Sequence, residues 1–595
     1  MRSRIGLGYA IDRELFYEQN KPPQVGADLD WFCTSWAAIP GILELDPTLT
    51  DRPSLDVPLL QRSMTPTQSL LIAMNVAPVD WWILGGSFVL LLTIAVKINQ
   101  QCRSVADYLI SGRKVRLWLG MGAGIAGEVG LVTIVSICEQ GYLRGFGFIL
   151  IGLLSTLILA PLFGIFGFGI ERFRASKVMT VSQYLEMRYS RRLRILSGIL
   201  NALAGVLQMC IFPIIGARFL RALIDAPAVV SQWGLTAPTE WILMGALLSC
   251  TVIFTFLGGY VTLIVTNFLQ MIVIMVAIYW LFFYLIADIG VQNLWTTLEN
   301  TKGLAGFYPF AAEGDAYGFV WFSWLMTMSV LLQFSYGPYL QKYASMDRPK
   351  TVSRAFLLSS LFTNGRTFVV LGLGVCALAA LGETPPDALG ASKAEWSTLA
   401  TPYYLSSVVP PVLMGVLLSG LVFADISTTD QYVLSWSTAI VNDCICPFLK
   451  SPLSPEAHIR AVRMTIVALC GLFFVFGMFY SPTLPLWDYL WLCANIIGGT
   501  GIAMLMGMYW SKTTTAGAYA AVLICLILPL ADLASRQIYA MRHPDGIYPI
   551  ASETTGLGTY VIALVALVVV SLASGGPTRF WDLARDVQVQ NEAEA

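Results

Sequence analysis

The sequence predicts an all-α integral membrane protein of about thirteen spanning helices, ten of which form two five-helix repeats of inverted orientation. Three observations predict this fold class. Of the 595 residues, 56% are hydrophobic and only 12% are charged, against about 25% charged in a soluble domain. Apolar runs of about 20 residues, long enough to cross a bilayer, recur along the chain. Two of these runs are interrupted by glycine or proline, and they stand five runs apart.

Composition also argues against several classes of function. The net charge of −1 carries no signal for a nucleic-acid partner, and none is expected. The eleven cysteines form no CxxC pair, so we expect free thiols and no disulfide framework. The chain has two histidines, His458 and His543, too few for a histidine-based metal site. This scarcity, without a nucleophile–base arrangement, argues against an enzyme.

Thirteen segments, plus or minus one, are predicted to span the membrane. The uncertainty comes from residues 408–446, which are long enough for two helices. The spans begin near Asp80, Leu117, Arg144, Arg194, Glu240, Val261, Tyr317, Ala355, Val408, Arg460, Leu484, Thr514 and Ser552.

The distribution of lysine and arginine sets the orientation. Basic residues gather in loops after the first, third, seventh and ninth spans, at residues 103–116, 172–194, 342–354 and 450–460. The alternate connections 289–316 and 383–405 hold one lysine each. The positive-inside rule then predicts an outside N-terminus, a cytoplasmic C-terminus and location in the plasma (inner) membrane. An odd number of spans agrees with this.

The ends of the chain differ from the membrane-spanning region 79–574. Residues 1–78 are polar and lack the basic-then-apolar start of a signal peptide. They are either an extracytoplasmic head or a mis-assigned segment, with translation starting at Met64 or Met74. Residues 575–595 are expected to be a short cytoplasmic tail.

An unusually polar stretch, VFADISTTDQY at 422–432, lies within the ninth span. On a helix Ala424, Ser427 and Thr428 share a face, and two hydroxyls plus a carbonyl are half of a site for a small hard cation. The alternative is that both hydroxyls bond back to their own helix. Asp425 and Asp430 favour function, because carboxylates at membrane depth are costly.

The other half of such a site requires broken backbone. MGAGIAGEVGLVTIV at 121–135 has four glycines around Glu128, and unwinding there would free the carbonyls of Ala126 and Val129. Helix packing through small residues is the alternative. LLQFSYGPYLQKY at 331–343 is similarly interrupted, beside Gln333 and Tyr336. The two interruptions divide the core into repeats of about 117–289 and 317–509.

Six segments in order resemble the sodium:solute symporter family, which includes proline, pantothenate, sialic acid and sodium–glucose symporters. They are SVADYLISGRKV (104–115), MTVSQYLEMRY (179–189), FLGGYVTLIVTNFLQ (256–270), LQKYASMDRPKTVSRA (340–355), SGLVFADISTTDQYVLSWSTAIVND (419–443) and MGMYWSKTTTAGAY (506–519). The resemblance, over roughly residues 80–535, implies a LeuT-type inverted-repeat fold with alternating access. It also implies a sodium site at Ala126, Val129, Ala424, Ser427 and Thr428.

The chain departs from the family pattern at some positions. Asn267 stands where many members carry an aspartate for a second sodium, and Asp430 would have to supply that charge. Glu128 falls where proline symporters have a coupling aspartate. Glu128, Asp425 and Asp430 have no obvious internal lysine or arginine partner in the sequence, which favours a cationic or zwitterionic solute, or added proton coupling.

The resemblance therefore implies a sodium-coupled secondary active symporter that imports a small organic solute, with sodium as the co-transported ion. The solute is expected near Glu128, Thr133, Gln333 and Tyr336. A solute sensor on the same fold and a proton-coupled symporter remain alternatives. The expected partners are the solute and the lipid bilayer, with a monomer as the functional unit.

Overall fold

The computed structural model describes residues 76–99, 105–232, 235–311, 317–384, 393–451, 453–480, 486–543 and 548–575. These residues are almost entirely helical, apart from one two-stranded antiparallel hairpin, so the all-α prediction is confirmed. Nearly all of the predicted head, 1–78, and of the tail, 575–595, falls outside the described residues.

Twelve helical segments of the described chain are long and apolar enough to cross a membrane, and one bent helix pair makes thirteen. Each begins within six residues of its predicted start. The ambiguous stretch at 408–446 forms one span, Leu413–Phe448.

The first half of the chain contains the first broken span and one sharp kink. At Gly259 φ is +55°, and a Cβ there would lie 2.6 Å from the carbonyl oxygen of Tyr108, so glycine lets one long helix bend into two spans. The elements in this half are α2 (Pro78–Asn99), α3 (Val105–Ile110), α4 (Leu117–Ala126), α5 (Leu131–Arg144), α6 (Gly147–Leu159), α7 (Ile170–Ala175), α8 (Val181–Arg188), α9 (Arg191–Met209), α10 (Phe212–Leu223), β1 (Val229–Gln232), β2 (Leu235–Pro238) and α11 (Thr239–Ile289).

The second half begins with a helix in a connection that the sequence marked only as a loop, and a second such helix follows at 393–408. The elements are α12 (Val291–Lys302), α13 (Gly318–Ser335), α14 (Gly337–Ser345), α15 (Pro349–Leu381), α16 (Lys393–Val408), α17 (Leu413–Ala439), α18 (Pro455–Phe479), α19 (Leu486–Tyr509), α20 (Thr515–Arg542) and α21 (Ser552–Ser574). Short 3₁₀ or π turns extend several of them.

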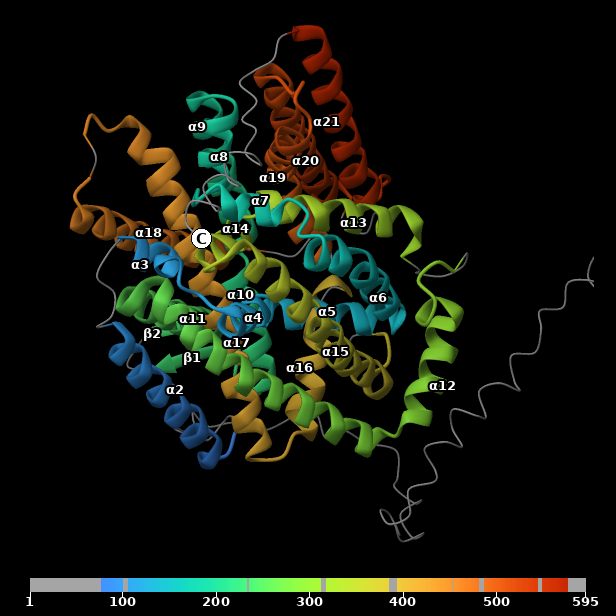
Figure 1. Cartoon of the computed structure of the whole chain (residues 1–595). Coiled ribbons are helices and arrows are strands. Elements are labelled where there is room, and N and C mark those ends of the chain that lie inside the picture. The colour runs from blue at the N-terminus through green and yellow to red at the C-terminus, as the bar shows by residue number, and fades with distance from the viewer. Residues whose placement is uncertain are drawn as a thin grey trace, which may run out of the picture. The chain divides into compact units, whose positions relative to one another are not determined.

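Helix α17 lies at the centre of the bundle (Figure 1) and is buried along nearly its whole length. It packs against α11, α2, α18 and α9, and it also touches α5 and α14. Helices α20 and α21 pack on each other and on α19, away from α2 and α11 (Figure 1). A helix that carries serines, threonines and aspartates is thus one of the two most buried spans, equal in this to α19.

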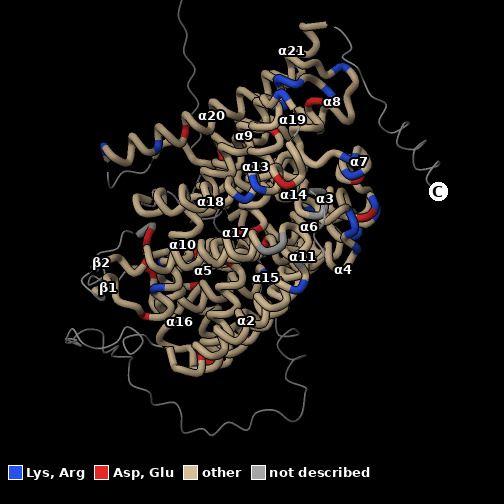
Figure 2. The backbone as a smooth tube through the Cα atoms, turned by 90° about the vertical axis from the view of Figure 1, so that its left-hand side faces the viewer, with Lys and Arg blue, Asp and Glu red and all other residues tan. Residues whose placement is uncertain are grey.

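Most of the basic residues gather at one edge of the bundle. Figure 2 shows lysine and arginine concentrated around α7, α8 and the start of α4, with the long spans mostly free of charge. Several of these basic side chains bond backbone carbonyls, as when Arg174 binds the carbonyls of Met346 and Asp347. Helix α7 is thereby tied to the connection between α14 and α15.

Candidate functional site

The first interrupted span is broken, as expected. Helices α4 and α5 are bent by 58° across residues 127–130. The N–H of Val129 donates to the carbonyl of Ala126 at 3.1 Å. No backbone N–H among the described residues donates to the carbonyl of Val129. The break therefore leaves the Val129 oxygen open and the Ala126 oxygen with one lone pair to spare.

Helix α17 presents two unpaired oxygen atoms to this break. A Cβ at Gly130 would lie 2.7 Å from Oγ1 of Thr428, and one at Gly127 would lie 2.1 Å from Oε1 of Gln431. Both oxygen atoms are buried and have no hydrogen-bond partner. The glycines thus bring the α4–α5 backbone against hydroxyl and amide oxygens that nothing in the described chain satisfies.

Ser427 behaves differently from its neighbour. Its hydroxyl donates to the carbonyl of Ala424 at 3.1 Å, the local bond that was the alternative to ion binding. Asn267 of α11 donates from Nδ2 to the carbonyl of Ser427 at 3.2 Å, and its own Oδ1 is buried without a partner. Asn267 therefore lies beside the polar segment, as the motif order implied.

Asp425 and Asp430 are both buried in α17 but lie away from the main cavity. Oδ1 of Asp425 faces Gly216 of α10, where a Cβ would lie 3.4 Å away. Oδ1 of Asp430 is buried without a hydrogen-bond partner. The structure thus separates these two carboxylates from the other residues expected to meet solute.

A cavity of about 330 Å³ lies beside the two broken helices. It falls within the usual size range of ligand pockets. Glu128, Thr133, Gln333 and Tyr336, the four residues expected near the solute, all line it. Sequence reasoning missed other lining residues, among them Phe148, Gln208, Asn364, Arg366, Trp487 and Trp491.

The second break occurs at Tyr336, between α13 and α14, and it also meets α17. The Tyr336 hydroxyl donates to Oε1 of Gln208 at 2.8 Å. Its ring packs edge-on against Tyr432 and Trp436, with centroids 5.6 and 5.5 Å away. Next to it, Gly337 packs against Trp436. Aromatic rings make up most of the surroundings of Tyr336, and Ser435 Oγ lies nearest to Gly337, 3.0 Å from the position of a Cβ there.

The expectation that Glu128, Asp425 and Asp430 have no internal cationic partner is wrong for Glu128. Nζ of Lys342 lies 3.7 Å from Oε1 of Glu128, and Arg366 of α15 lines the same cavity as Glu128. Lys342 is also not a loop residue. The helix restarts at Gly337, so α14 carries Lys342 back into the protein, where its side chain is 8% exposed. The argument for a cationic solute loses its basis.

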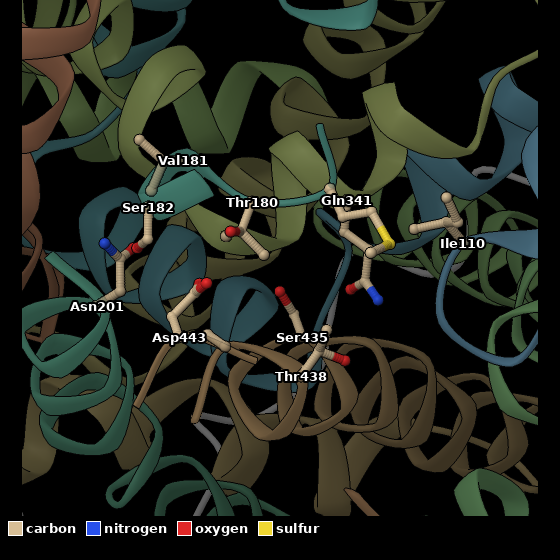
Figure 3. Close-up of a pocket in the computed structure, with 12 residues that line it drawn as sticks. Ile110, Thr180, Val181, Ser182, Asn201, Gln341, Ser435, Thr438 and Asp443 are labelled. Atoms are coloured by element: carbon tan, nitrogen blue, oxygen red, sulfur yellow. The ribbon is translucent and has the colours of Figure 1, made fainter. Parts of the chain in front are cut away.

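A second pocket, of about 20 Å³, lies among α8, α9, α14 and the end of α17. Figure 3 shows Thr180, Gln341 and Ser435 around its centre, with Asp443 directed toward Thr180. Asp443 is paired with Nε of Arg194 at 3.2 Å. A space of this size holds about one water molecule, so the pocket is too small for an organic solute. Its polar groups instead link α8 and α9 to α17.

Two broken helices that face one buried polar helix define a helical membrane transporter of the LeuT type. A solved structure of a Na⁺-coupled sialic acid symporter, in a substrate-bound outward-open state, has the same fold. It matches with a TM-score of 0.68 at 17% identity, covering 85% of this chain and 100% of that one. The predicted LeuT-type fold is confirmed.

Sequence comparison gives the family. Residues 108–525 match the profile of the sodium:solute symporter family. The chain is 22% identical over 476 residues to a sodium/sialic acid symporter of Proteus mirabilis, covering 76% of this chain and 89% of that protein. It is 23% identical over 398 residues to a sodium/pantothenate symporter of Haemophilus influenzae, covering 65% and 75%. The chain belongs to the sodium:solute symporter family, whose members couple solute transport across a membrane to sodium.

Proposed function

We propose that the coupling sodium ion binds between the first break and α17. Its ligands would be the carbonyl oxygens of Ala126, Val129 and Ala424 and the hydroxyls of Ser427 and Thr428. The observation that carries this is Thr428 Oγ1, which is buried and unpaired against Gly130 of the break. A buried hydroxyl without a partner costs about 1–3 kcal/mol, which an ion bound at this oxygen would offset.

The solute would occupy the 330 Å³ cavity. Glu128 both lines the cavity and belongs to the broken segment that supplies the Val129 carbonyl. Ordering that segment around sodium would therefore also fix one wall of the solute site. This shared segment couples the two ligands, and the coupling is reciprocal, so each binds more tightly when the other is present.

Transport would follow alternating access between two five-helix repeats, at about residues 117–289 and 317–509. The N-terminus would lie outside and the C-terminus in the cytoplasm of a plasma (inner) membrane, as the basic loops indicate. Asp425, Asp430 and Asn267 would act in coupling rather than in solute contact, since none of them lines the cavity. A monomer would suffice, because both breaks face one α17.

The ion site is tested by equilibrium binding of ²²Na⁺ to the purified protein. Thr428→Val keeps the side-chain shape but removes the hydroxyl, and we expect at least a tenfold weaker affinity, equivalent to about 1.4 kcal/mol. Thr429→Val is the matched control, because Thr429 is also buried but points about 100° further round the helix. Equal weakening by both substitutions would contradict the proposed site.

A further inference from the structure

Arg366 is a buried cation without a partner in the wall of the large cavity. It lies within the long span α15 and is 5% exposed. Its Nε and Nη1 atoms have no hydrogen bond, and no carboxylate forms an ion pair with it in the described chain. Arginine stays protonated in proteins, so this site keeps a full positive charge.

The other buried arginines show how unusual this is. Four described arginines are less than 9% exposed: Arg174, Arg188, Arg366 and Arg536. Arg536 bonds Oδ2 of Asp532 and the carbonyl of Ile550, both at 2.7 Å. Arg174 and Arg188 each bond two backbone carbonyls. An uncompensated buried charge costs several kcal/mol. A bound anionic ligand would offset this cost at Arg366.

The nearest carboxylate does not neutralise the cavity. Glu128 lies on the same wall, but it already faces Nζ of Lys342 at 3.7 Å. Glu128 and Arg366 are the charged residues among the described lining. When Lys342 is counted, which pairs with Glu128 but does not itself line the cavity, one carboxylate and two cations leave one net positive charge. A monoanion matches this charge, whereas a phosphate group carries nearly two negative charges at neutral pH.

The rest of the cavity is shaped for a polar organic molecule. Along α15, the residues Ser359, Thr363 and Thr367 face it at intervals of one helical turn, and Asn364 lies beside them. Trp487 and Trp491 contribute apolar surface from α19. This combination of hydroxyls, amides and indole rings suits a solute with both hydrogen-bonding and apolar parts.

We propose that the cavity binds organic monoanions and that the Arg366 guanidinium holds the solute carboxylate. This rests on the proposed function, because it names the class of solute that the symporter carries. An arginine binds a carboxylate through two parallel N–H groups, either Nε with Nη2 or Nη1 with Nη2. Nε and Nη1 of Arg366 are both unpaired, so each of these edges has a free donor. The Glu128–Lys342 pair would keep Glu128 from occupying that position.

Thermal unfolding with matched solutes tests the carboxylate. The purified protein is melted in sodium chloride with pantothenate against panthenol, N-acetylneuraminate against its methyl ester, and gluconate against glucose. We expect at least one acid to raise the melting temperature while its neutral counterpart does not. Arg366→Gln should weaken that acid roughly 10- to 100-fold, the loss expected for a charge-assisted bond. Arg354→Gln, an exposed arginine of the same helix, is the control and should bind normally.

A second measurement needs no solute. Removing an uncompensated charge should stabilise the empty protein, so Arg366→Met should raise its melting temperature, whereas Arg536→Met should lower it. Three results would overturn the proposal. The neutral counterparts could stabilise the protein as strongly as the acids, or none of the acids could stabilise it. The third is a fall in melting temperature for Arg366→Met. If sodium still raises the melting temperature of every Arg366 variant, the proposed sodium site is unaffected by the failure of this proposal. If sodium does not raise the melting temperature of wild type, the result counts against the sodium site instead.

Discussion

The two broken spans meet the same helix with different chemistry. At the first break, between α4 and α5, the backbone lies against Thr428 and Gln431, whose oxygens are unpaired. At the second, between α13 and α14, Tyr336 lies against the rings of Tyr432 and Trp436, about one turn further along α17. The first offers oxygen to an ion, and the second offers flat surface and a hydroxyl to a solute.

The lengths of the breaks match these roles. Four residues separate α4 from α5, which exposes a backbone carbonyl, whereas only Tyr336 separates α13 from α14. Ion coordination needs backbone oxygens released from the helix. A change of direction that places one aromatic side chain needs far less unwinding. Under the proposed function, the first break would thus serve the ion and the second the solute.

Among substitutions at the two breaks, Glu128→Gln should reduce transport the most, because it removes the only charged side chain of the first break. We expect it to abolish uptake into proteoliposomes. It would also leave the buried Lys342 unpaired. Because the Glu128 side chain is 32% exposed, we expect a loss of about 1–3 kcal/mol, less than for a fully buried pair. Adding Lys342→Met should restore thermal stability without restoring transport. Full uptake with unchanged sodium dependence in Glu128→Gln would remove Glu128 from the mechanism.

Gly130→Ala should come next. Its Cβ would lie within 2.9 Å of three side-chain atoms of Thr428, a β-branched residue that cannot turn away in a packed core. We expect a loss of about 1–3 kcal/mol in stability, with ²²Na⁺ binding weakened as well. Gly127→Ala is the comparison, because its close contact is mainly the flexible end of Gln431. If Gly127→Ala impaired sodium binding more than Gly130→Ala, the ion would belong nearer Gln431.

Tyr336→Phe should have the smallest effect, confined to the second break. It removes one hydrogen bond, to Gln208, while the ring contacts remain. A net loss of about 1 kcal/mol would weaken solute binding about fivefold. Titration of solute in sodium, followed by thermal shift, measures this. The shift produced by sodium alone should not change, and a change there would show that the two breaks are not separable.

Local pattern was enough to predict the spans and both breaks. Runs of apolar residues mark the helices, and the glycines at 122–130 and Gly337–Pro338 mark the interruptions. The contact of Thr428 with Gly130 could not be predicted from local sequence pattern, because residues so far apart in the chain meet only through tertiary packing. Lys342 was misplaced because the basic residues at 348–354 follow it closely, and the restart of the helix at Gly337 hides its burial.

Arg366 was missed although the sequence carried a signal. It lies in the interior of the long apolar run that becomes α15, beside Asn364 and Gly365. An arginine within a membrane span is expected to serve a functional site. The acidic residues alone predicted an acidic cavity. In the structure, Arg366 and Lys342 together outnumber Glu128 by one charge.

Sodium binding between the first break and α17 is tested most directly by thermal unfolding of the purified protein. Wild type and Ser427→Ala/Thr428→Ala would be melted in increasing sodium chloride, with potassium chloride at equal ionic strength as the control. At about 100 times the dissociation constant, a bound ion stabilises by about 2.7 kcal/mol. The account predicts a sodium-specific rise in wild type that is lost in the double variant. An equal rise in potassium, or one retained by the double variant, would contradict it.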